Sequence, residues 1–498
     1  MSISDLPIIP LSPASNSNRK SLTVIALVIL ADFLLFDREL GLNLFLMVNA
    51  SAIGILVCAR RSRSLWSTAT LLLLCTLLSL PLLETPSWMG VSVSMLGLIS
   101  VSLGGSGLLP RRWQRLPVIV LRFLLDLPLR PFRKTTYSRF RHSRRATPQA
   151  IWSYLRGWIM PLGFAAGFVA LFANANPLIE KALRSVDFYY LLQFLDIWRI
   201  GFWLVIALGL FILLHPRLKR LPSRGHQAII DRSRRPSEFF GHTALLRSLV
   251  LFNALFTIQT LLDLTYLWGG ASLPDGMSHA EYAHRGAYPL MATALLAAVF
   301  VLAAMRRGGP GDHSRLIRAL VHLWIAQNIL LCVSSILRLD LYVESYSLTE
   351  LRVAAGIWMG LVAVGLFLIL LRILLHRSNE WLVALSMAAL VATLYGTALA
   401  DIPAFIARFN VAHSQEISGD GVPLDIEYLS TLGPSVLPAL DAYLANLPTG
   451  WTEKAAVATN LRNAFVWSNP HNPDDWRSWT FRTVRLDHYL RDHPTLAR

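Results

Sequence analysis

Long apolar runs separated by short polar connections dominate the hydrophobic pattern of the chain. The runs cover residues 21–36, 41–59, 65–83, 88–109, 152–173, 198–214, 248–268, 288–305, 317–337, 353–374 and 381–401. A run of about 20 apolar residues can cross the roughly 30 Å hydrocarbon layer of a membrane as a helix. The pattern therefore predicts an all-α fold, a polytopic transmembrane bundle of about 11 spans.

The charges in the connections predict an orientation for this bundle. Lys and Arg accumulate before the first span and in every second connection after it, around residues 60–63, 110–147, 215–237, 306–307 and 372–377. Acidic residues gather in the connections between these. Because Lys and Arg near span ends stay on the cytoplasmic side, we expect the N-terminus inside and the C-terminus outside.

Composition supports a membrane protein and indicates where lipid would bind. Only 15% of residues are charged, too few for the surface of a soluble chain of 498 residues. The net charge of +16 comes largely from the two longest basic connections. The first contains "LPVIVLRFLLDLPLRPF", which is typical of an amphipathic interfacial helix. We expect membrane lipids, and anionic lipid at the basic loops, as partners; the absence of a recognition fold argues against nucleic acid.

Five regions are predicted along the chain. They are a disordered cytoplasmic N-terminus (1–20), a four-span membrane region (21–109), a basic loop with the interfacial helix (110–150), a seven-span membrane domain (151–405) and a helical extracytoplasmic tail (406–498). In the tail, Pro434 suits a first helical turn, Thr452 suits an N-cap, and Asp474 and Asp475 are expected to cap a last helix. The three cysteines suggest neither a disulfide framework nor a zinc site.

Polar side chains inside the spans are the first candidates for function. Asn253, Gln259, His322 and Gln327 could line a polar path near the midplane, because such residues are costly in lipid unless they are paired. The alternative is interhelical hydrogen bonding, which needs only one partner for each group.

A charged cluster at the outer ends of two spans is the second candidate. Its members are Asp263, Asp275, Glu281, His284, Arg285, Arg338, Asp340 and Glu344. Glu281 and Arg285 are four apart with the acid first, the favoured order for a helical ion pair. The cluster therefore fits a structural clasp somewhat better than an active site. No nucleophile elbow, phosphate loop or metal-ligand spacing is present, so no catalytic residue, metal or cofactor is assigned.

Several stretches of the chain resemble a known family. "FNALFTIQTLLDLTYLWGG", "YAHRGAYPL", "SSILRLDLYVESYSLTELR" and "LGPSVLPALDAYL" resemble the uncharacterised bacterial polytopic membrane proteins catalogued as domain of unknown function 4173. The resemblance covers roughly residues 150 to 445 and leaves the first four spans outside. It implies a bacterial inner-membrane location, and it implies no reaction, cofactor or catalytic residue.

Three functions remain open at this point. The favoured hypothesis is a non-enzymatic multi-pass protein of the bacterial inner membrane, whose outer-face charged cluster docks its own tail or an envelope partner in signalling or envelope maintenance. The second is a transporter or lipid flippase that uses the polar path. The third is a membrane transferase acting on a lipid-linked substrate at the outer face.

Overall fold

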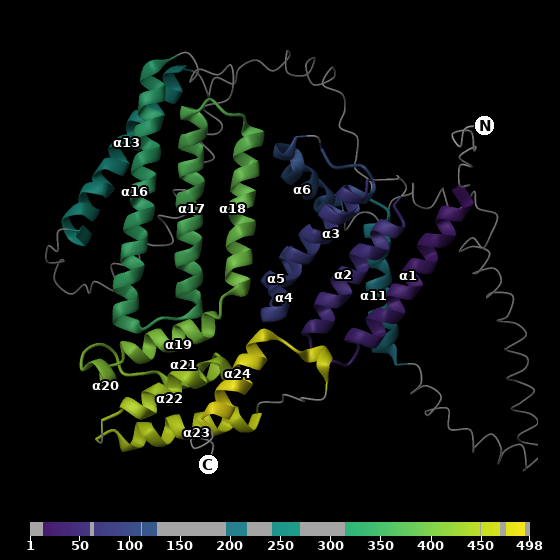
Figure 1. Cartoon of the computed structure of the whole chain (residues 1–498). Helices are drawn as coiled ribbons and strands as arrows, with labels where there is room; N and C mark the ends of the chain where they lie inside the picture. The colour runs from purple at the N-terminus through teal and green to yellow at the C-terminus, as the bar shows by residue number, and fades with distance from the viewer. Residues whose placement is uncertain are drawn as a thin grey trace, which may run out of the picture.

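The computed structural model of the chain is helical throughout the part that it describes. This part comprises residues 13–59, 64–110, 112–126, 196–216, 242–268, 314–448, 450–468 and 475–493. Within these ranges the only β-type pairing is one isolated bridge between Ser414 and Val422. The all-α prediction is confirmed for these residues. The helices form two membrane groups and a cap at one end of both (Figure 1).

The first helix group contains most of the N-terminal part of the chain. Its helices are α1 (Pro13–Leu35), α2 (Leu42–Val57), α3 (Leu65–Ser79), α4 (Pro81–Glu84), α5 (Trp88–Gly105) and α11 (Ile197–Leu214). Ser64 and Ser87 accept backbone hydrogen bonds at the starts of α3 and α5, which fixes where these helices begin. Gly97 allows α5 to approach α3, because a Cβ there would lie 3.3 Å from the Cα of Cys75.

The second helix group follows it in the chain. Its members are α13 (His242–Asp263) with the π-helical turn η4 (Leu264–Trp268), α16 (Arg315–Tyr346), α17 (Glu350–Leu374) and α18 (Asn379–Leu399). Trp324 of α16 anchors the contact with α13. Its ring stacks on Phe252 at 5.1 Å and meets Phe256 edge-on at 5.8 Å. The group is therefore held together by ordinary apolar packing at the level of these rings.

Helix α18 joins the two groups. It packs along α5, and its Tyr395 hydroxyl donates to the carbonyl oxygen of Leu77 in α3 at 3.1 Å. At the end opposite the cap, Glu380 of α18 pairs with Arg115 at 3.1 Å. Arg115 ends η2 (Trp113–Arg115), just before α6 (Leu116–Asp126), the described part of the predicted interfacial helix. Phe123 of α6 is fully buried against α5 and α11.

The cap is a compact helical unit after Leu399. It contains α19 (Ile402–Ala412), α20 (Gln415–Ser418), α21 (Ile426–Thr431), η5 (Pro434–Val436), α22 (Leu437–Asn446), α23 (Thr452–Ser468), η6 (Trp476–Ser478) and α24 (Phe481–Asp492). Its apolar core, around Leu429, Leu440 and Tyr443, also takes in Val343 and Leu348 from α16 and the loop after it. The apolar core of the cap therefore continues into the end of the second helix group that adjoins the cap.

The number of spans differs from the prediction. Seven helices in the described residues are long and apolar enough to cross a membrane, beginning with Leu65–Glu84 and ending with Asn379–Leu399. The count of eleven is not supported, because α2 has only 16 residues and α1 starts with a polar stretch from Pro13. The expected spans 152–173 and 288–305 lie outside the described residues.

Three local predictions also need correction. Helix α16 continues to Tyr346, beyond residue 337, where the predicted apolar span ends; no Gly or Pro interrupts the stretch. Asp475 caps the short turn η6, whereas Thr480 forms the capping box of the last helix, α24. Pro434 opens η5, as expected for a residue of a first helical turn. Thr452, predicted as an N-cap, is instead the first residue inside α23.

Candidate functional site

The structure brings two members of the predicted charged cluster together inside the helix bundle. Arg338 of α16 forms an ion pair with Asp263 at the end of α13, and both side chains are at most 3% exposed. Gln259, one turn before Asp263, donates to the same carboxylate oxygen at 2.9 Å. A buried Arg and Asp neutralise each other, which makes this pair tolerable where neither charge would be alone.

The other members of the predicted cluster are not part of this pair. Asp340 and Glu344 are exposed on later turns of α16. Asp275, Glu281, His284 and Arg285 lie outside the described residues, so the expected Glu281–Arg285 clasp stays a prediction. Asp263 is followed at once by the π-helical turn η4. Such turns interrupt the regular α-helical hydrogen bonds and are frequent at functional sites.

The predicted polar path is partly assembled between α13 and α16. The Asn253 amide donates to the Leu320 carbonyl at 3.1 Å, and the Gln327 amide donates to the Thr257 hydroxyl at 2.7 Å. Gln259 belongs to the ion pair instead. His322 does not belong to this line, because five residues of α-helix turn it about 140° away from Gln327.

Five buried oxygen atoms on α13 and α16 have no hydrogen-bond partner among the described residues. They are the side-chain oxygens Asn253 Oδ1, Thr260 Oγ1, Asp263 Oδ2, Gln327 Oε1 and Asn328 Oδ1. Leaving such an atom unpaired costs about 1 to 3 kcal/mol. Five of them would cost about 5 to 15 kcal/mol, which is comparable to the whole stability of a domain.

The orientation of the amides explains why the unpaired atoms of Asn253, Gln327 and Asn328 are their oxygens. In Asn253 and Asn328 the amide nitrogen donates to a backbone carbonyl four residues earlier, at 2.7 Å in both cases. In Gln327 the nitrogen is committed to Thr257. The opposite flip of Asn253 or Asn328 would place the amide oxygen against a carbonyl oxygen, which is also an acceptor. We call this line of oxygens along α13 and α16 the polar seam.

A second polar site attaches the cap to the first helix group. Glu84, the last residue of α4, has a side chain only 8% exposed and forms an ion pair with Arg485 of α24. Arg482 lies 3.8 Å from Glu84 and 3.5 Å from Asp401. The pKa of Arg485 is raised, chiefly by its hydrogen bond to Glu84. Glu84 was not among the predicted site residues, although it is the only acid between the apolar runs 65–83 and 88–109.

A backbone contact fixes the cap to the loop between α1 and α2. The N–H of Leu42 donates to the Trp479 carbonyl at 2.9 Å, and a Cβ on Gly41 would lie 2.5 Å from the Ser478 carbonyl oxygen. Only glycine permits so close an approach. Arg477 adds a hydrogen bond to the Phe33 carbonyl at 3.0 Å and lies over the Phe33 ring.

The attachment to the second group uses one buried amide. Asn410 of α19 accepts from the Leu348 N–H at 2.8 Å and donates to the Leu348 carbonyl at 2.9 Å. It thereby satisfies the backbone of the turn between α16 and α17, where Ser347 has a positive φ of 65°. The Tyr428 hydroxyl accepts from the Glu350 N–H at 2.8 Å, and burial raises the pKa of Tyr428.

Two charged networks hold the cap itself together. Asp441 of α22 accepts from Arg462 of α23 at 2.5 Å and from the Tyr489 hydroxyl of α24 at 2.8 Å, so three helices meet on one carboxylate. Burial and the Asp441 hydrogen bond raise the pKa of Tyr489. Glu416 forms an ion pair with Lys454 and accepts from the Leu424 N–H. Burial raises the pKa of Glu416, but these hydrogen bonds outweigh it and leave the pKa lowered.

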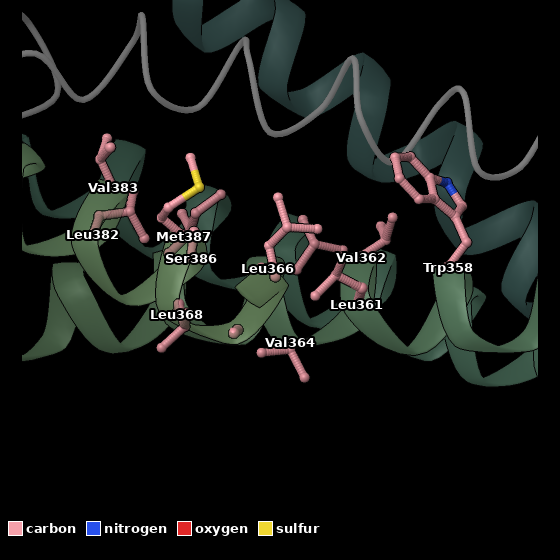
Figure 2. A pocket seen from close by; sticks show the side chains of 14 residues that line it. Trp358, Leu361, Val362, Val364, Leu366, Leu368, Leu382, Val383, Ser386 and Met387 are labelled. Atoms are coloured by element: carbon pink, nitrogen blue, oxygen red, sulfur yellow. The ribbon is translucent and has the colours of Figure 1, made fainter. Parts of the chain in front are cut away.

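An apolar groove of about 410 Å³ lies between α17 and α18. Figure 2 shows side chains from both helices along it, including Leu366 and Met387, with Trp358 toward one end. Ser386 is the single polar side chain in this lining. The groove offers no group for chemistry. In the described part of the chain, no three His, Cys, Asp or Glu side chains gather as metal ligands.

The comparison with protein families assigns the chain to one of them. The family described as "Domain of unknown function (DUF4153)" matches residues 68–443, more than half of the chain. The chain belongs to the DUF4153 family. The resemblance to domain of unknown function 4173 is therefore wrong. Apolar stretches with charged ends recur in many multi-pass proteins, because the membrane imposes them, and they do not separate one such family from another.

The DUF4153 region also has different limits from those expected. It begins inside α3 and ends at Tyr443 in α22, so α3 to α5 fall within it. The region includes the first half of the cap and excludes α1, α2, α23 and α24. Neither the curated proteins nor the solved structures gave a match. The family and the apolar helices together establish a membrane protein of the DUF4153 family and show no specific role.

Proposed function

We propose that this DUF4153 protein is a non-enzymatic multi-pass protein of a bacterial inner membrane whose cap is a fixed platform for an envelope partner. The attachment of the cap to both helix groups supports this role. Asn410 bonds the α16–α17 turn, Arg485 bonds Glu84, and the Trp479 carbonyl accepts from Leu42. A domain tied down at three separated points cannot swing as a mobile lid, and it suits rigid presentation of a surface.

The distribution of charge supports an orientation for this platform. Figure 1 shows the starts of α16 and α18 at the end opposite the cap. Arg315 is the first residue of α16, Arg377 comes just before α18, and Arg115 pairs with Glu380 of α18. Lys20 of α1 donates to the Leu214 carbonyl at the end of α11. Acidic residues lie at the cap end, among them Glu84, Asp263, Asp340 and Asp401. By the positive-inside rule the basic end is cytoplasmic and the cap is extracytoplasmic. Anionic lipid would then bind at the basic end.

The orientation is tested by fusing alkaline phosphatase or green fluorescent protein after Arg498 of the full chain. Phosphatase is active only outside the cytoplasm, so we expect an active phosphatase fusion and a dark fluorescent one. The reverse pattern would refute the orientation and, with it, an extracytoplasmic platform.

The platform role is tested by photo-crosslinking from the cap in living cells. A photoreactive residue at Val457 or Trp467, which are 48% and 89% exposed, should give one discrete protein adduct. The same residue at Leu204 of α11, 66% exposed on an apolar helix, is the matched control and should give none. If no position on the cap gives a protein adduct, the platform role is refuted.

The polar seam favours a second candidate function, transport along α13 and α16. Five buried oxygens without described partners are more than interhelical bonding requires. If protons move along the seam, Asn253→Leu and Gln327→Leu should abolish proton flux into liposomes that contain a pH-sensitive dye. Asn49→Leu in the first group should leave that flux unchanged. Equal flux in all variants and in empty liposomes would exclude this candidate.

A further inference from the structure

The polar seam differs from the buried polar residues described in the first helix group, because its amide oxygens have no hydrogen-bond partner among the described residues. In the first helix group, Asn43 is fully buried, its nitrogen donates to Leu34 and Glu39, and its oxygen accepts from the N–H of Gly41 and Leu44. In the seam the amide nitrogens of Asn253, Gln327 and Asn328 are bonded, and their amide oxygens are not. The seam therefore offers hydrogen-bond acceptors and needs an occupant that brings donors.

The net charge of the polar seam indicates which kind of hydrogen-bond donor could bind there. Arg338 already neutralises Asp263, so the seam as described carries no net charge that would hold a bare cation in lipid. A neutral hydroxyl donor fits this environment. Water is the smallest such donor, and a buried water requires two to four polar partners, which neighbouring seam oxygens can supply.

We propose that the polar seam binds a file of water molecules between α13 and α16. Asn253 and Asp263 lie ten residues apart on α13, which corresponds to about 15 Å along the helix axis, or about half of the hydrocarbon layer. Between them, Thr260 contributes its hydroxyl from the same face of the helix. The file therefore reaches from the level of Asn253 to the Asp263–Arg338 pair.

The end of the file at Asp263 lies nearer the cap, because Arg338 lies only five residues before Val343, which packs in the core of the cap. The stacked rings of Phe252 and Trp324 lie near the other end, at the level of Asn253. This inference rests on the seam alone and does not depend on the platform role.

The wild-type chain contains its own control for a direct test. In nanodiscs, with asparagine labelled with nitrogen-15, water-edited solid-state NMR measures the transfer of magnetisation from water to side-chain amides. Asn253 and Asn328, 6% and 1% exposed, are compared with Asn43, which is 0% exposed and fully bonded. We expect at least about tenfold faster transfer to the two seam amides, because they lie within contact of bound water. The single variant Asn328→Leu assigns its signal.

Transfer to Asn253 and Asn328 as slow as transfer to Asn43 would overturn the proposal. Transfer that comes from a co-purified organic molecule rather than from water would overturn the assignment of water as the occupant. Mass spectrometry of the same nanodiscs distinguishes these two results.

A chemical experiment gives an independent answer. In a background with Cys58, Cys75 and Cys332 changed to alanine, Thr260→Cys is compared with Ser94→Cys of α5. Ser94 is 1% exposed and its hydroxyl is bonded to the Gly90 carbonyl at 2.7 Å. A small water-soluble methanethiosulfonate reacts with thiolates, which form where water is present. We expect labelling of Thr260→Cys to be about tenfold faster, and equal rates in two folded variants would contradict the water file.

Discussion

The two helix groups contain similar polar residues, but they differ in whether the side-chain atoms of these residues have hydrogen-bond partners. In the first group, Asn49 accepts from Thr76 at 2.7 Å and donates to Ser79 at 3.1 Å, and no buried side-chain oxygen or nitrogen of the described residues there lacks a partner. In the second group, Asn253 and Asn328 each keep an unpaired oxygen. The residue type alone therefore does not mark a site inside a membrane protein. What distinguishes candidate functional polar residues from structural ones is the number of buried donor and acceptor atoms without a hydrogen-bond partner.

The largest expected effect comes from the charged pair of the second group. Asp263→Ala leaves Arg338 buried without its carboxylate, and it should cost about 3 to 5 kcal/mol in the free energy of unfolding. The matched variant Asp32→Ala removes the partner of Arg199, whose side chain is 47% exposed, and should cost far less. Unfolding in mixed micelles with increasing SDS measures both.

A double variant sharpens this test. Asp263→Leu combined with Arg338→Met removes both charges and should recover most of the stability lost by Asp263→Ala. Recovery is expected only if the pair is structural. A double variant that stays as unstable as Asp263→Ala would show that the two side chains do not act as a pair.

The next effect concerns the attachment of the cap to the first group. Gly41→Ala places a Cβ against the Ser478 carbonyl oxygen and should cost about 1 to 3 kcal/mol through displacement of the backbone. Limited proteolysis should then cut near residue 475 faster. Gly209→Ala in α11 is the control, since nothing lies within 4 Å of its Cβ, and it should stabilise the chain slightly through helix propensity. Equal proteolysis of Gly41→Ala and wild type would contradict the contact.

A smaller effect is expected from the ion pair at Glu84. Because the Arg485 side chain is 57% exposed, Arg485→Ala should cost at most about 1 kcal/mol. The swapped double variant, Glu84→Arg with Arg485→Glu, should be less stable than wild type, since Arg482 would then face a like charge. Thermal unfolding of the cap, followed by the fluorescence of Trp476 and Trp479, measures both variants.

The smallest effect is a pH dependence within the cap. Hydrogen bonds to Lys454 and to the Leu424 N–H leave the pKa of Glu416 below its unfolded value, despite burial. Its contribution to stability is therefore complete above about pH 4.3, the ordinary pKa of glutamate, and is lost as the pH falls through the lower folded value. Thermal unfolding between pH 7 and pH 3 should show this loss, and Glu416→Gln should reduce the slope. An unchanged slope in Glu416→Gln would assign the acid sensitivity to other carboxylates.

Hydrophobic periodicity predicted the positions of most described helices. Predicted runs at 198–214 and 381–401 correspond to α11 (Ile197–Leu214) and α18 (Asn379–Leu399). It failed at residues 338–346, where charged residues were taken to end the span. An apolar helix can continue past an arginine such as Arg338 if a carboxylate far away in the sequence, here Asp263, neutralises the charge. The local pattern of hydrophobic residues does not reveal that partner.

The candidate site was predictable in its residues and not in its pairing. Asp263 and Arg338 were both expected at the outer face, but 75 positions separate them and the sequence gives no means of matching them. Glu84 was overlooked because its partner Arg485 lies 401 positions away. Which polar atoms remain unfilled is also a property of the packed helices, and it appears only when the donors and acceptors of neighbouring helices are placed.

The contact between the α1–α2 loop and η6 has a consequence for biogenesis. Arg38 and Asp475 are separated by 437 positions, which corresponds to roughly 20 to 90 s of synthesis at about 5 to 20 residues per second. Both segments lie outside the DUF4153 region, one before it and one after it. During that interval the first hairpin to enter the membrane has an unfilled surface at Gly41, and only the last helices translated can cover it. The N-terminal hairpin is thus covered only when translation of the chain is complete. A nascent protein truncated before η6 would expose this surface to quality-control proteases.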